Sequence, residues 1–305
     1  MDEIKIIVSD DYDDVRMDVC ISSLLTDKSR TYIQKLIKEG NVLLNGKTVN
    51  PSVKVHVDDE IVLNIPESRE LNIKPENIPL DILYEDKDII IVNKGKDMVV
   101  HPAPGHYEGT LVNALLYYCK DNLSGINGVL RPGIVHRIDK DTTGSLIVCK
   151  TNEAHTIMAD KLKIHDIDRR YRAIVYGVFK DKEGTIRTNI GRNPSDRLKM
   201  AVNVPNGKEA VTHYKVLSES NEYSYIECRL ETGRTHQIRV HMATINHPIL
   251  GDDLYCNRKT NIKLNGQTLH AYYLKFIHPV TGNEIETIAP LPDYFEKLLK
   301  NLNLA

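Results

Sequence analysis

The chain has 305 residues, of which 41% are hydrophobic and 27% charged, a composition typical of a soluble globular protein with one large domain or two. Its 40 Lys and Arg against 42 Asp and Glu give a net charge of −2, which excludes a global attraction to nucleic acid or membranes and leaves only local ones. No apolar run reaches the length of a transmembrane helix, and the acidic N-terminus is unlike a signal peptide. The five cysteines are odd in number and widely spaced, which is typical of free thiols. We therefore expect a cytoplasmic protein with reduced cysteines.

Residues 1–64 are predicted to form a small unit with a net charge of −4. Apolar spacing predicts helices over 14–25 and 29–38. The second helix is expected to begin at Ser29, which can act as the N-cap, and to end at Gly40.

The same unit carries turn signals after its helices. Residues 42–44 lead into Asn45-Gly46, the strongest short-range signal for a β-hairpin, and residues 55–63 predict two strands joined by a turn. Arg30 and Lys35 lie on the second predicted helix, whose basic face is either solvated or in contact with phosphates.

Residues 65–80 carry three prolines among polar residues and are predicted to form an extended linker. Residues 81–305 mix strands and helices without a βαβ repeat, which favours an α+β fold with a large, mostly antiparallel sheet and flanking helices. Strands are predicted at 88–93, 145–149, 170–176, 211–217 and 224–230. Helices are predicted at 109–120, 152–163, 235–243 and 293–301.

Several common chemistries have no support in the sequence. There is no P-loop, no Gly-x-Gly-x-x-Gly after a strand and no Gly-x-Ser-x-Gly. His236 and His241 are five residues apart and do not share one helix face, and no cysteines pair as Cys-x-x-Cys. We therefore expect neither a cofactor nor a bound metal ion.

Two segments stand out as candidate sites. Residues 131–144 combine basic, acidic and hydroxyl side chains immediately before an apolar strand, which is typical of an active-site loop, although a plain turn with a capping Asp is the alternative. In residues 230–241 a glycine and a threonine open a short helix that carries Arg and His on neighbouring turns. Arg234, near the start of that helix, is predicted to reach a phosphate or an active-site carboxylate, unless the helix is simply a basic surface helix.

The segment from His136 to Gly144 resembles the catalytic motif of RluA-type pseudouridine synthases, usually written His-Arg-Leu-Asp-x-x-Thr-Ser-Gly. Residues 93–102, 170–173 and 233–241 resemble three further motifs of this family, in order and at family-like spacing. The N-terminal unit is similar to the S4 RNA-binding domain. The arrangement is most similar to the S4-containing RluD and RluC branch, whose members modify large-subunit ribosomal RNA.

One motif departs from the family pattern. The usual Lys-Pro-x-Gly is here Lys94-Gly95-Lys96-Asp97. Because Asp tolerates a left-handed backbone better than most residues, we expect an altered loop and not a lost activity.

The resemblance implies that the chain isomerises uridine to pseudouridine within RNA without a cofactor. The family pattern makes Asp139 the catalytic carboxylate, acting either as a nucleophile or as a base at the sugar, and implies that Arg234 keeps it charged. It also implies that Tyr171 lies against the flipped uracil and assists proton removal from C5, although core packing is the alternative for an isolated Tyr in a strand.

The resemblance also implies residues that bind RNA. Arg137 would occupy the space left by the flipped uridine, and His136 would contact the RNA backbone or order its own loop. Arg30 and Lys35 of the S4-like unit are predicted to meet phosphates. The expected partner is 23S-type ribosomal RNA or an assembling large subunit, with no membrane involved and a monomeric protein. A noncatalytic RNA-binding or ribosome-assembly protein on the same scaffold, or the same chemistry on transfer RNA, are the alternatives.

Overall fold

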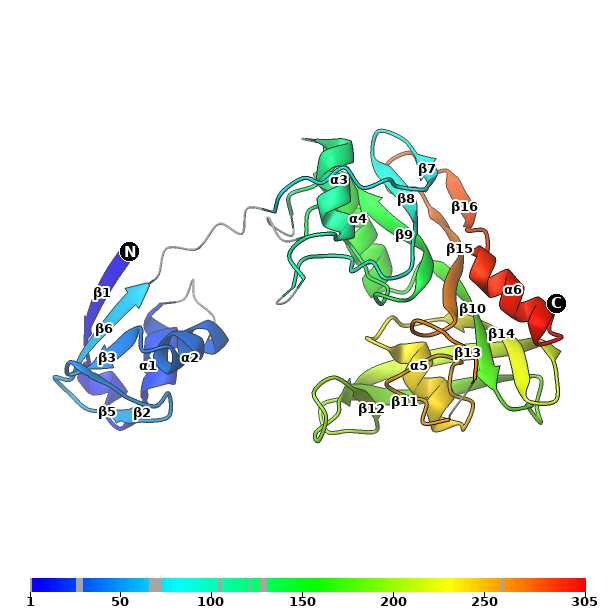
Figure 1. The fold of residues 1–305 in the computed structure, drawn as a ribbon. Coiled ribbons are helices and arrows are strands. Elements are labelled where there is room, and N and C mark those ends of the chain that lie inside the picture. Colours follow the sequence, from blue (N-terminus) through cyan, green and yellow to red (C-terminus); the bar gives the residue numbers. More distant parts are fainter. Residues whose placement is uncertain are drawn as a thin grey trace. The chain divides into compact units, whose positions relative to one another are not determined.

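The computed structural model describes residues 2–25, 30–65, 73–103, 106–120, 122–126, 131–258 and 261–305. The chain divides into two compact units, Met1–Asn72 and Ile73–Ala305 (Figure 1). Most of the predicted linker, residues 66–72, lies outside the described residues, as does the predicted N-cap Ser29. Ile73, within the predicted linker, already packs into the core of the second unit.

The first unit packs two short helices against small antiparallel sheets. A four-stranded sheet has the order β1-β6-β3-β4, and β2 pairs with β5 in a separate ribbon. Its elements are β1 (Asp2–Ile7), β2 (Val15–Arg16), α1 (Met17–Leu24), α2 (Arg30–Lys38), β3 (Val42–Leu44), β4 (Lys47–Thr48), β5 (Lys54–Val55) and β6 (Glu60–Ile65).

Most of the elements predicted for this unit are confirmed. Asn45 and Gly46 both have positive φ, as a tight two-residue hairpin turn requires, and Gly40 has a positive φ just after α2. The predicted helix over 14–25 begins later than expected, because Val15 and Arg16 pair with β5 before the chain turns into α1. The two strands predicted within 55–63 are present but join different sheets.

The second unit is built on one ten-stranded sheet with the order β12-β11-β13-β14-β10-β15-β9-β8-β7, in which β16 also pairs with β15. Every pairing is antiparallel except that of β9 with β15. Its strands are β7 (Ile82–Glu85), β8 (Ile89–Lys94), β9 (Thr143–Cys149), β10 (Asp168–Tyr176), β11 (Glu183–Arg192), β12 (Met200–Val202), β13 (Lys208–Glu219), β14 (Tyr223–Leu230), β15 (Leu269–Ile277) and β16 (Glu284–Ile288).

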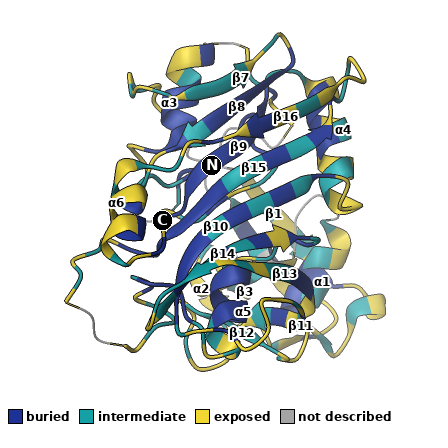
Figure 2. Ribbon diagram, turned by 90° about the vertical axis from the view of Figure 1, so that its right-hand side faces the viewer, coloured by how far each residue is buried: buried dark blue, intermediate teal, exposed yellow. Residues whose placement is uncertain are grey.

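The helices of this unit cover both faces of the sheet. They are α3 (Leu111–Cys119), α4 (Asn152–Lys163), α5 (Gln237–Thr244) and α6 (Asp293–Asn301). Alternate residues of β8 and β9 face either the cluster that contains α3 or the one that contains α4, so these two helices lie on opposite faces. The same alternation along β10 separates α5 from α6. The strands between them are mostly buried (Figure 2).

The parallel contact between β9 and β15 is short and very close. Only Thr143 and Gly144 pair with β15, opposite His270 and Ala271. Gly144 has φ +105°, and a Cβ there would lie 2.3 Å from the carbonyl oxygen of Ala271. Only glycine therefore fits at this position, directly after the motif loop. Among the described residues, no helix is long and apolar enough to cross a membrane.

Candidate active site

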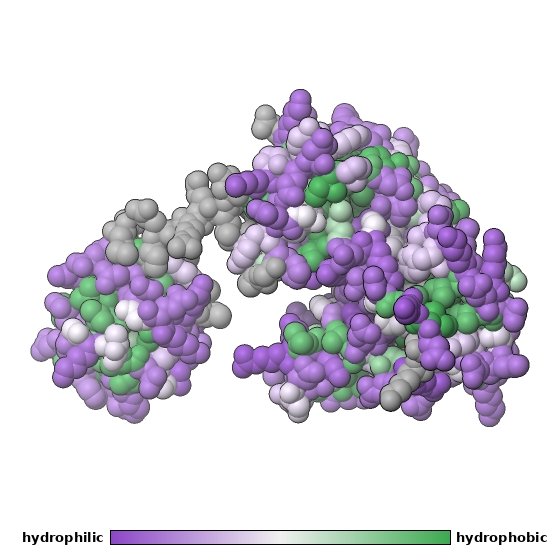
Figure 3. Space-filling model, in the orientation of Figure 1, coloured by the Kyte–Doolittle hydropathy of each residue, from purple (hydrophilic) through white to green (hydrophobic). Residues whose placement is uncertain are grey.

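Asp139 lies in the loop that precedes β9, at the boundary of two cavities. One cavity of about 50 Å³ is lined by Asp139 together with Tyr171 and Arg234, and another of about 330 Å³ adjoins it on the side of Lys140. Arg137 lines both cavities. In the space-filling view the second unit is hollowed between the part that carries α3 and the part that carries α5 (Figure 3). Residues distant in sequence thus converge around one carboxylate.

Arg239, in the first turn of α5, is the arginine that binds Asp139. Its Nη1 donates to Asp139 Oδ2 at 2.9 Å, while Nε and Nη2 donate to the two oxygens of the buried Asp252 at 2.7 and 2.8 Å. The bidentate bond to Asp252 fixes the guanidinium plane, so the third bond fixes the orientation of Asp139. No hydrogen bond reaches Asp139 Oδ1 from the described residues, and about a fifth of the Asp139 side chain, 19%, is exposed.

The expectation that Arg234 holds Asp139 is wrong. Arg234 lines the same cavity, but its Nε donates to the carbonyl oxygen of Glu209 at 2.8 Å. The reason is where the helix begins: α5 starts at Gln237, so Arg234 lies in the preceding loop, and its backbone N–H donates to Gln237 Oε1. Arg239 is inside the helix and faces the motif loop instead.

His236 completes the polar surroundings of Asp139. It adopts a left-handed backbone conformation at the N-cap of α5, and its Nε2 lies 3.8 Å from Asp139 Oδ1. Its Nδ1 is 2.9 Å from the hydroxyl of Tyr255, whose ring also lies beside the guanidinium of Arg239. Burial lowers the pKa of His236, partly opposed by the charge of Asp139, so the imidazole is neutral at physiological pH.

Tyr171 projects from β10 into the same cavity. The pairing of β10 with β15 shifts register between Arg170 and Tyr171, and such an irregularity re-aims a side chain at the edge of a site. The ring is 8% exposed and lines the cavity next to Asp139. Burial raises the pKa of Tyr171, partly opposed by the charge of Arg169 and reinforced by that of Asp139, so the phenol keeps its proton at neutral pH.

His136 and Arg137 precede Asp139 and behave differently. His136 Nε2 accepts a hydrogen bond from the backbone N–H of Ile147 in β9 at 2.9 Å, and burial, helped by the charge of Arg169, lowers its pKa to about 3. The neutral ring therefore ties the loop to the sheet. Arg137 is exposed at the mouth of the cavities, and no hydrogen bond or ion pair within the described part of the chain holds its side chain.

Lys94 anchors the other end of the Asp139 loop. Its side chain is almost fully buried, and its Nζ donates to the carbonyl oxygens of Gly95, Met98 and Lys140 at 2.7 to 2.9 Å. Lys140 directly follows Asp139, so the buried amine holds the backbone beside the carboxylate. Asp97 has φ +63°, which confirms the left-handed position expected where the family pattern has glycine.

Comparison with known proteins identifies the family. Residues 88–244 match the model of RNA pseudouridylate synthases, and residues 15–61 match the S4 domain. The chain belongs to the RNA pseudouridylate synthase family. It is an S4-containing pseudouridine synthase, as its motifs indicated, and the α+β fold with a mostly antiparallel sheet is confirmed.

Relatives match this pseudouridine synthase over nearly its whole length. It is 48% identical to the RNA pseudouridine synthase YlyB of Bacillus subtilis, with 99% of each chain covered. It is 45% identical to ribosomal large subunit pseudouridine synthase D of Zymomonas mobilis, with 95% and 94% covered, and 42% identical to that of Escherichia coli, with 93% and 90% covered. The structure of human RNA pseudouridylate synthase domain containing 4 superimposes with a TM-score of 0.59 at 25% identity, covering 73% of this chain and 93% of that one.

The predicted RNA-binding residues of the first unit lie on α2. Arg30 is half exposed, but its guanidinium donates to the buried carboxylate of Asp18 at 3.0 to 3.1 Å. Lys35 is 67% exposed on its side chain and faces only Glu39, at 3.8 Å. Lys35 is thus free to meet a phosphate, whereas Arg30 also holds the unit together.

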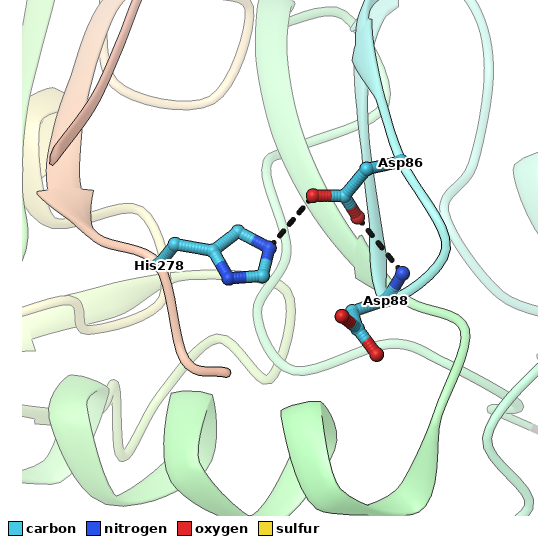
Figure 4. A group of neighbouring side chains, drawn as sticks. All are labelled: Asp86, Asp88 and His278. Atoms are coloured by element: carbon cyan, nitrogen blue, oxygen red, sulfur yellow. Dashed lines mark hydrogen bonds and ion pairs between the residues drawn. The ribbon is translucent and has the colours of Figure 1, made fainter. Parts of the chain in front are cut away.

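A second polar cluster of the pseudouridine synthase joins Asp86, Asp88 and His278 (Figure 4). His278 Nδ1 accepts the backbone N–H groups of Val280 and Thr281, so its proton resides on Nε2, which lies 2.8 Å from Asp86 Oδ2. Asp86 Oδ1 accepts the N–H groups of Asp88 and the following residue. The atoms of Asp86 and His278 that could bind a metal ion already make contacts that link the β7–β8 turn to the segment after β15. We therefore interpret the cluster as a structural contact and not as a metal site.

Sequence reasoning missed Arg239, Asp252 and Tyr255 as members of the site. Arg239 stood within the matched motif, three residues after His236, and that spacing places both on one face of a helix. Asp252 and Tyr255 carry no comparable signal, because only the packing of the loop after α5 brings them beside Arg239.

Proposed function

We propose that this pseudouridine synthase converts uridine to pseudouridine in large-subunit ribosomal RNA, with Asp139 as the catalytic carboxylate. The observation that carries the proposal is the oriented Asp139, which is bound at Oδ2 by Arg239 and keeps Oδ1 for a substrate. Relatives of 42 to 45% identity named ribosomal large subunit pseudouridine synthase D support the choice of target.

The reaction breaks the bond from uracil N1 to the ribose and forms one from C5 to the same ribose carbon, after which C5 loses its proton. Asp139 Oδ1 would act at the sugar, either by adding to the ribose or by removing a proton from it. Both roles need a carboxylate with one oxygen free and the other held, which is the arrangement around Asp139.

Tyr171 and Arg137 would handle the extruded base. Tyr171 offers a buried ring beside Asp139 against which uracil can stack, and its protonated hydroxyl can donate a hydrogen bond. Arg137, exposed at the cavity mouth, can extend its planar guanidinium into the stack that the uridine leaves. His136 would serve by ordering the loop.

The first unit would supply general RNA affinity. We assign the first unit, Met1–Asn72, to RNA binding through Lys35 and, in part, Arg30, and the second unit, Ile73–Ala305, to catalysis. The RNA partner is 23S-type ribosomal RNA, free or in an assembling subunit, and the protein acts as a cytoplasmic monomer.

Tritium release tests this proposal. Large-subunit ribosomal RNA transcript labelled at uridine C5 is incubated with the wild type, with Asp139→Asn and with Asp253→Asn, an exposed carboxylate beside the same cavities. The wild type and Asp253→Asn should release tritium, and Asp139→Asn should be slower by at least about 10³-fold, because the reacting carboxylate is lost. Equal release by Asp139→Asn would contradict its role. If tritium were released only from labelled transfer RNA, the proposed reaction would stand and the proposed target would be wrong.

A further inference from the structure

A second cavity, of about 480 Å³, adjoins the active site and is strongly cationic. It shares Arg137, Tyr171 and Arg234 with the cavity around Asp139. The basic residues that line it are Arg137, Lys163, Arg169, Lys208 and Arg234, with His136 and His165. Among the described residues that line it there is no Asp or Glu. We call it the cationic pocket.

Arg169 is the least expected member of the cationic pocket. It is 6% exposed, its Nε has no hydrogen-bond partner, and its best bond is from Nη2 to the carbonyl oxygen of Glu231 at 3.5 Å. No carboxylate lies within ion-pair distance of it in the part of the chain that the structure describes. A buried guanidinium without a counter-ion is costly, and Arg234 adds a second positive charge nearby.

The backbone beside Arg169 is shaped to keep its guanidinium in place. A Cβ at Gly233 would lie 2.7 Å from Arg169 Nη1, so any larger residue there would displace the side chain. Gly233 and Arg234 belong to the same motif segment that leads into α5. The motif therefore maintains, at the wall of a cavity, a charge that no carboxylate in the described part of the chain neutralises.

In a neighbouring cavity of the same volume, by contrast, basic side chains are paired with carboxylates. It is lined by Asp168, Arg170, Lys275 and Glu284 among others. Its Arg170 binds Asp168 at 2.7 Å, and its Lys275 binds Glu284 at 3.0 Å. The unpaired guanidinium of Arg169 thus lies in the cavity that adjoins Asp139, whereas Arg170 and Lys275 of the neighbouring cavity are paired with carboxylates.

We propose that the cationic pocket binds one phosphodiester group of the RNA backbone beside the target uridine, through Arg169, Lys208 and Arg234. This inference rests on the proposed function, since it names where the substrate's backbone lies. Arg169 and Tyr171 are two residues apart on one strand, and therefore about 6.6 Å apart, which is within the span of one nucleotide. Tyr171 would contact the base while Arg169 and its neighbours neutralise the adjacent phosphate.

Equilibrium binding tests the electrostatic part. Affinity for the ribosomal RNA transcript is measured against salt concentration in an Asp139→Asn background, which prevents turnover. Lys208→Gln should weaken binding and lower the slope of log affinity against log salt by about 0.7 to 0.9, because one phosphate contact is lost. Lys297→Gln, an exposed lysine on α6, is the matched control and should change neither value.

A single neutral linkage tests the position. A short RNA fragment that the protein binds is made with one methylphosphonate beside the target uridine. The wild-type pocket should lose about 10-fold in affinity for the neutral linkage, and Lys208→Gln or Arg169→Lys should lose less than about 3-fold from the same change, because they have already lost the contact. Arg169→Lys keeps the positive charge and removes only the planar guanidinium with its paired N–H donors, so we expect this variant to fold.

The outcomes separate the two levels of the proposal. The proposal is supported if the neutral linkage weakens binding less in Lys208→Gln and Arg169→Lys than in the wild type. The proposal would be overturned if the two losses simply added, or if Lys208→Gln left the salt slope unchanged. Failure of the proposed target would look different, because the wild type would release no tritium from ribosomal RNA while the coupling between pocket and phosphate persisted.

Discussion

Asp18 and Asp139 both bind arginine, but their surroundings differ in the number of hydrogen bonds they supply. Asp18 in the first unit is fully buried and accepts hydrogen bonds from Arg16, Arg30 and Gln34. Burial alone would raise its pKa, but these bonds hold the pKa of Asp18 well below its usual range. Both carboxylate oxygens are bonded inside the fold.

Asp139 in the second unit has the same type of partner and a different arrangement. It accepts one bond, from Arg239, and part of its side chain is exposed to the cavity. Asp252 holds Arg239 from the other side, so the Arg239–Asp139 pair is fixed in orientation while Asp139 stays accessible from the cavity. The comparison teaches that binding by arginine does not separate the two carboxylates: Asp18 has both oxygens bonded within the fold, whereas Asp139 keeps one oxygen for a substrate, as its proposed role requires.

The largest expected effect comes from the arginine that holds Asp139. Arg239→Gln should lower kcat for tritium release by about 10²- to 10³-fold, because the orientation of Asp139 is lost and Asp252 is left buried without its partner. Arg234→Gln should leave kcat within about 3-fold and mainly raise KM, since Arg234 does not touch Asp139. A large loss of kcat in Arg234→Gln with a normal Arg239→Gln would break the comparison.

The structural carboxylate should behave in the converse way. Asp18→Asn should destabilise the first unit by about 3 kcal/mol, because a buried and fully bonded charge is removed. Hydrogen exchange at the amides of α1 and α2 measures this locally, which is appropriate in a chain of two units. The intrinsic rate of tritium release at saturating RNA should not change, and a drop comparable to that of Arg239→Gln would contradict the assignment.

The pH dependence of Asp18 sharpens the same point. Its pKa in the folded protein is lower than the unfolded value of about 3.9, so its stabilisation is complete above pH 4 and is lost as the pH falls further. The protection lost by Asp18→Asn should therefore be constant from pH 7 to about pH 5 and shrink below about pH 4. A difference that grew on acidification would have the wrong sign.

The smallest effect concerns the ring that adjoins Asp139. Tyr171→Phe should keep RNA affinity and slow release of the C5 hydrogen by about 10-fold, equivalent to one hydrogen bond. Because Tyr255 belongs to the site, the control for general effects of losing a phenol hydroxyl is Tyr225→Phe, on the side of the sheet covered by α6, which should leave release unchanged. Unchanged release in Tyr171→Phe would remove its hydroxyl from proton transfer and leave only its ring.

Local sequence patterns predicted most of the individual elements. The helices α3, α4 and α6 and the central strands lie close to their expected ranges, because apolar periodicity and caps such as Thr110 and Thr151 are local properties. Five strands of the second unit were not predicted: β7, β11, β12, β15 and β16. Of these, β15 joins the two halves of the sheet. Its first three residues, Leu269 to Ala271, are all buried, so the strand lacks the simple alternation of apolar and polar residues that a half-buried strand shows.

The active site could be predicted only in part. The motif around Asp139 is contiguous, so its residues were found together. Arg234 was assigned as the partner of Asp139 because the family resemblance implied it. Arg239 lies five residues further along the same motif, inside α5, and its bond to Asp139 depends on how that helix packs against the motif loop. Asp252 could not be found at all because it is fixed only by tertiary packing.

The short contact between β9 and β15 also bears on how the enzyme is made. Thr143 and His270, which meet there, are 127 residues apart, so the neighbour of the motif loop is synthesised long after the loop itself. Contacts this distant in sequence form late, because a long segment of chain must be closed first. A growing chain can complete the first unit early, but it can have no finished active site until β15 has left the ribosome.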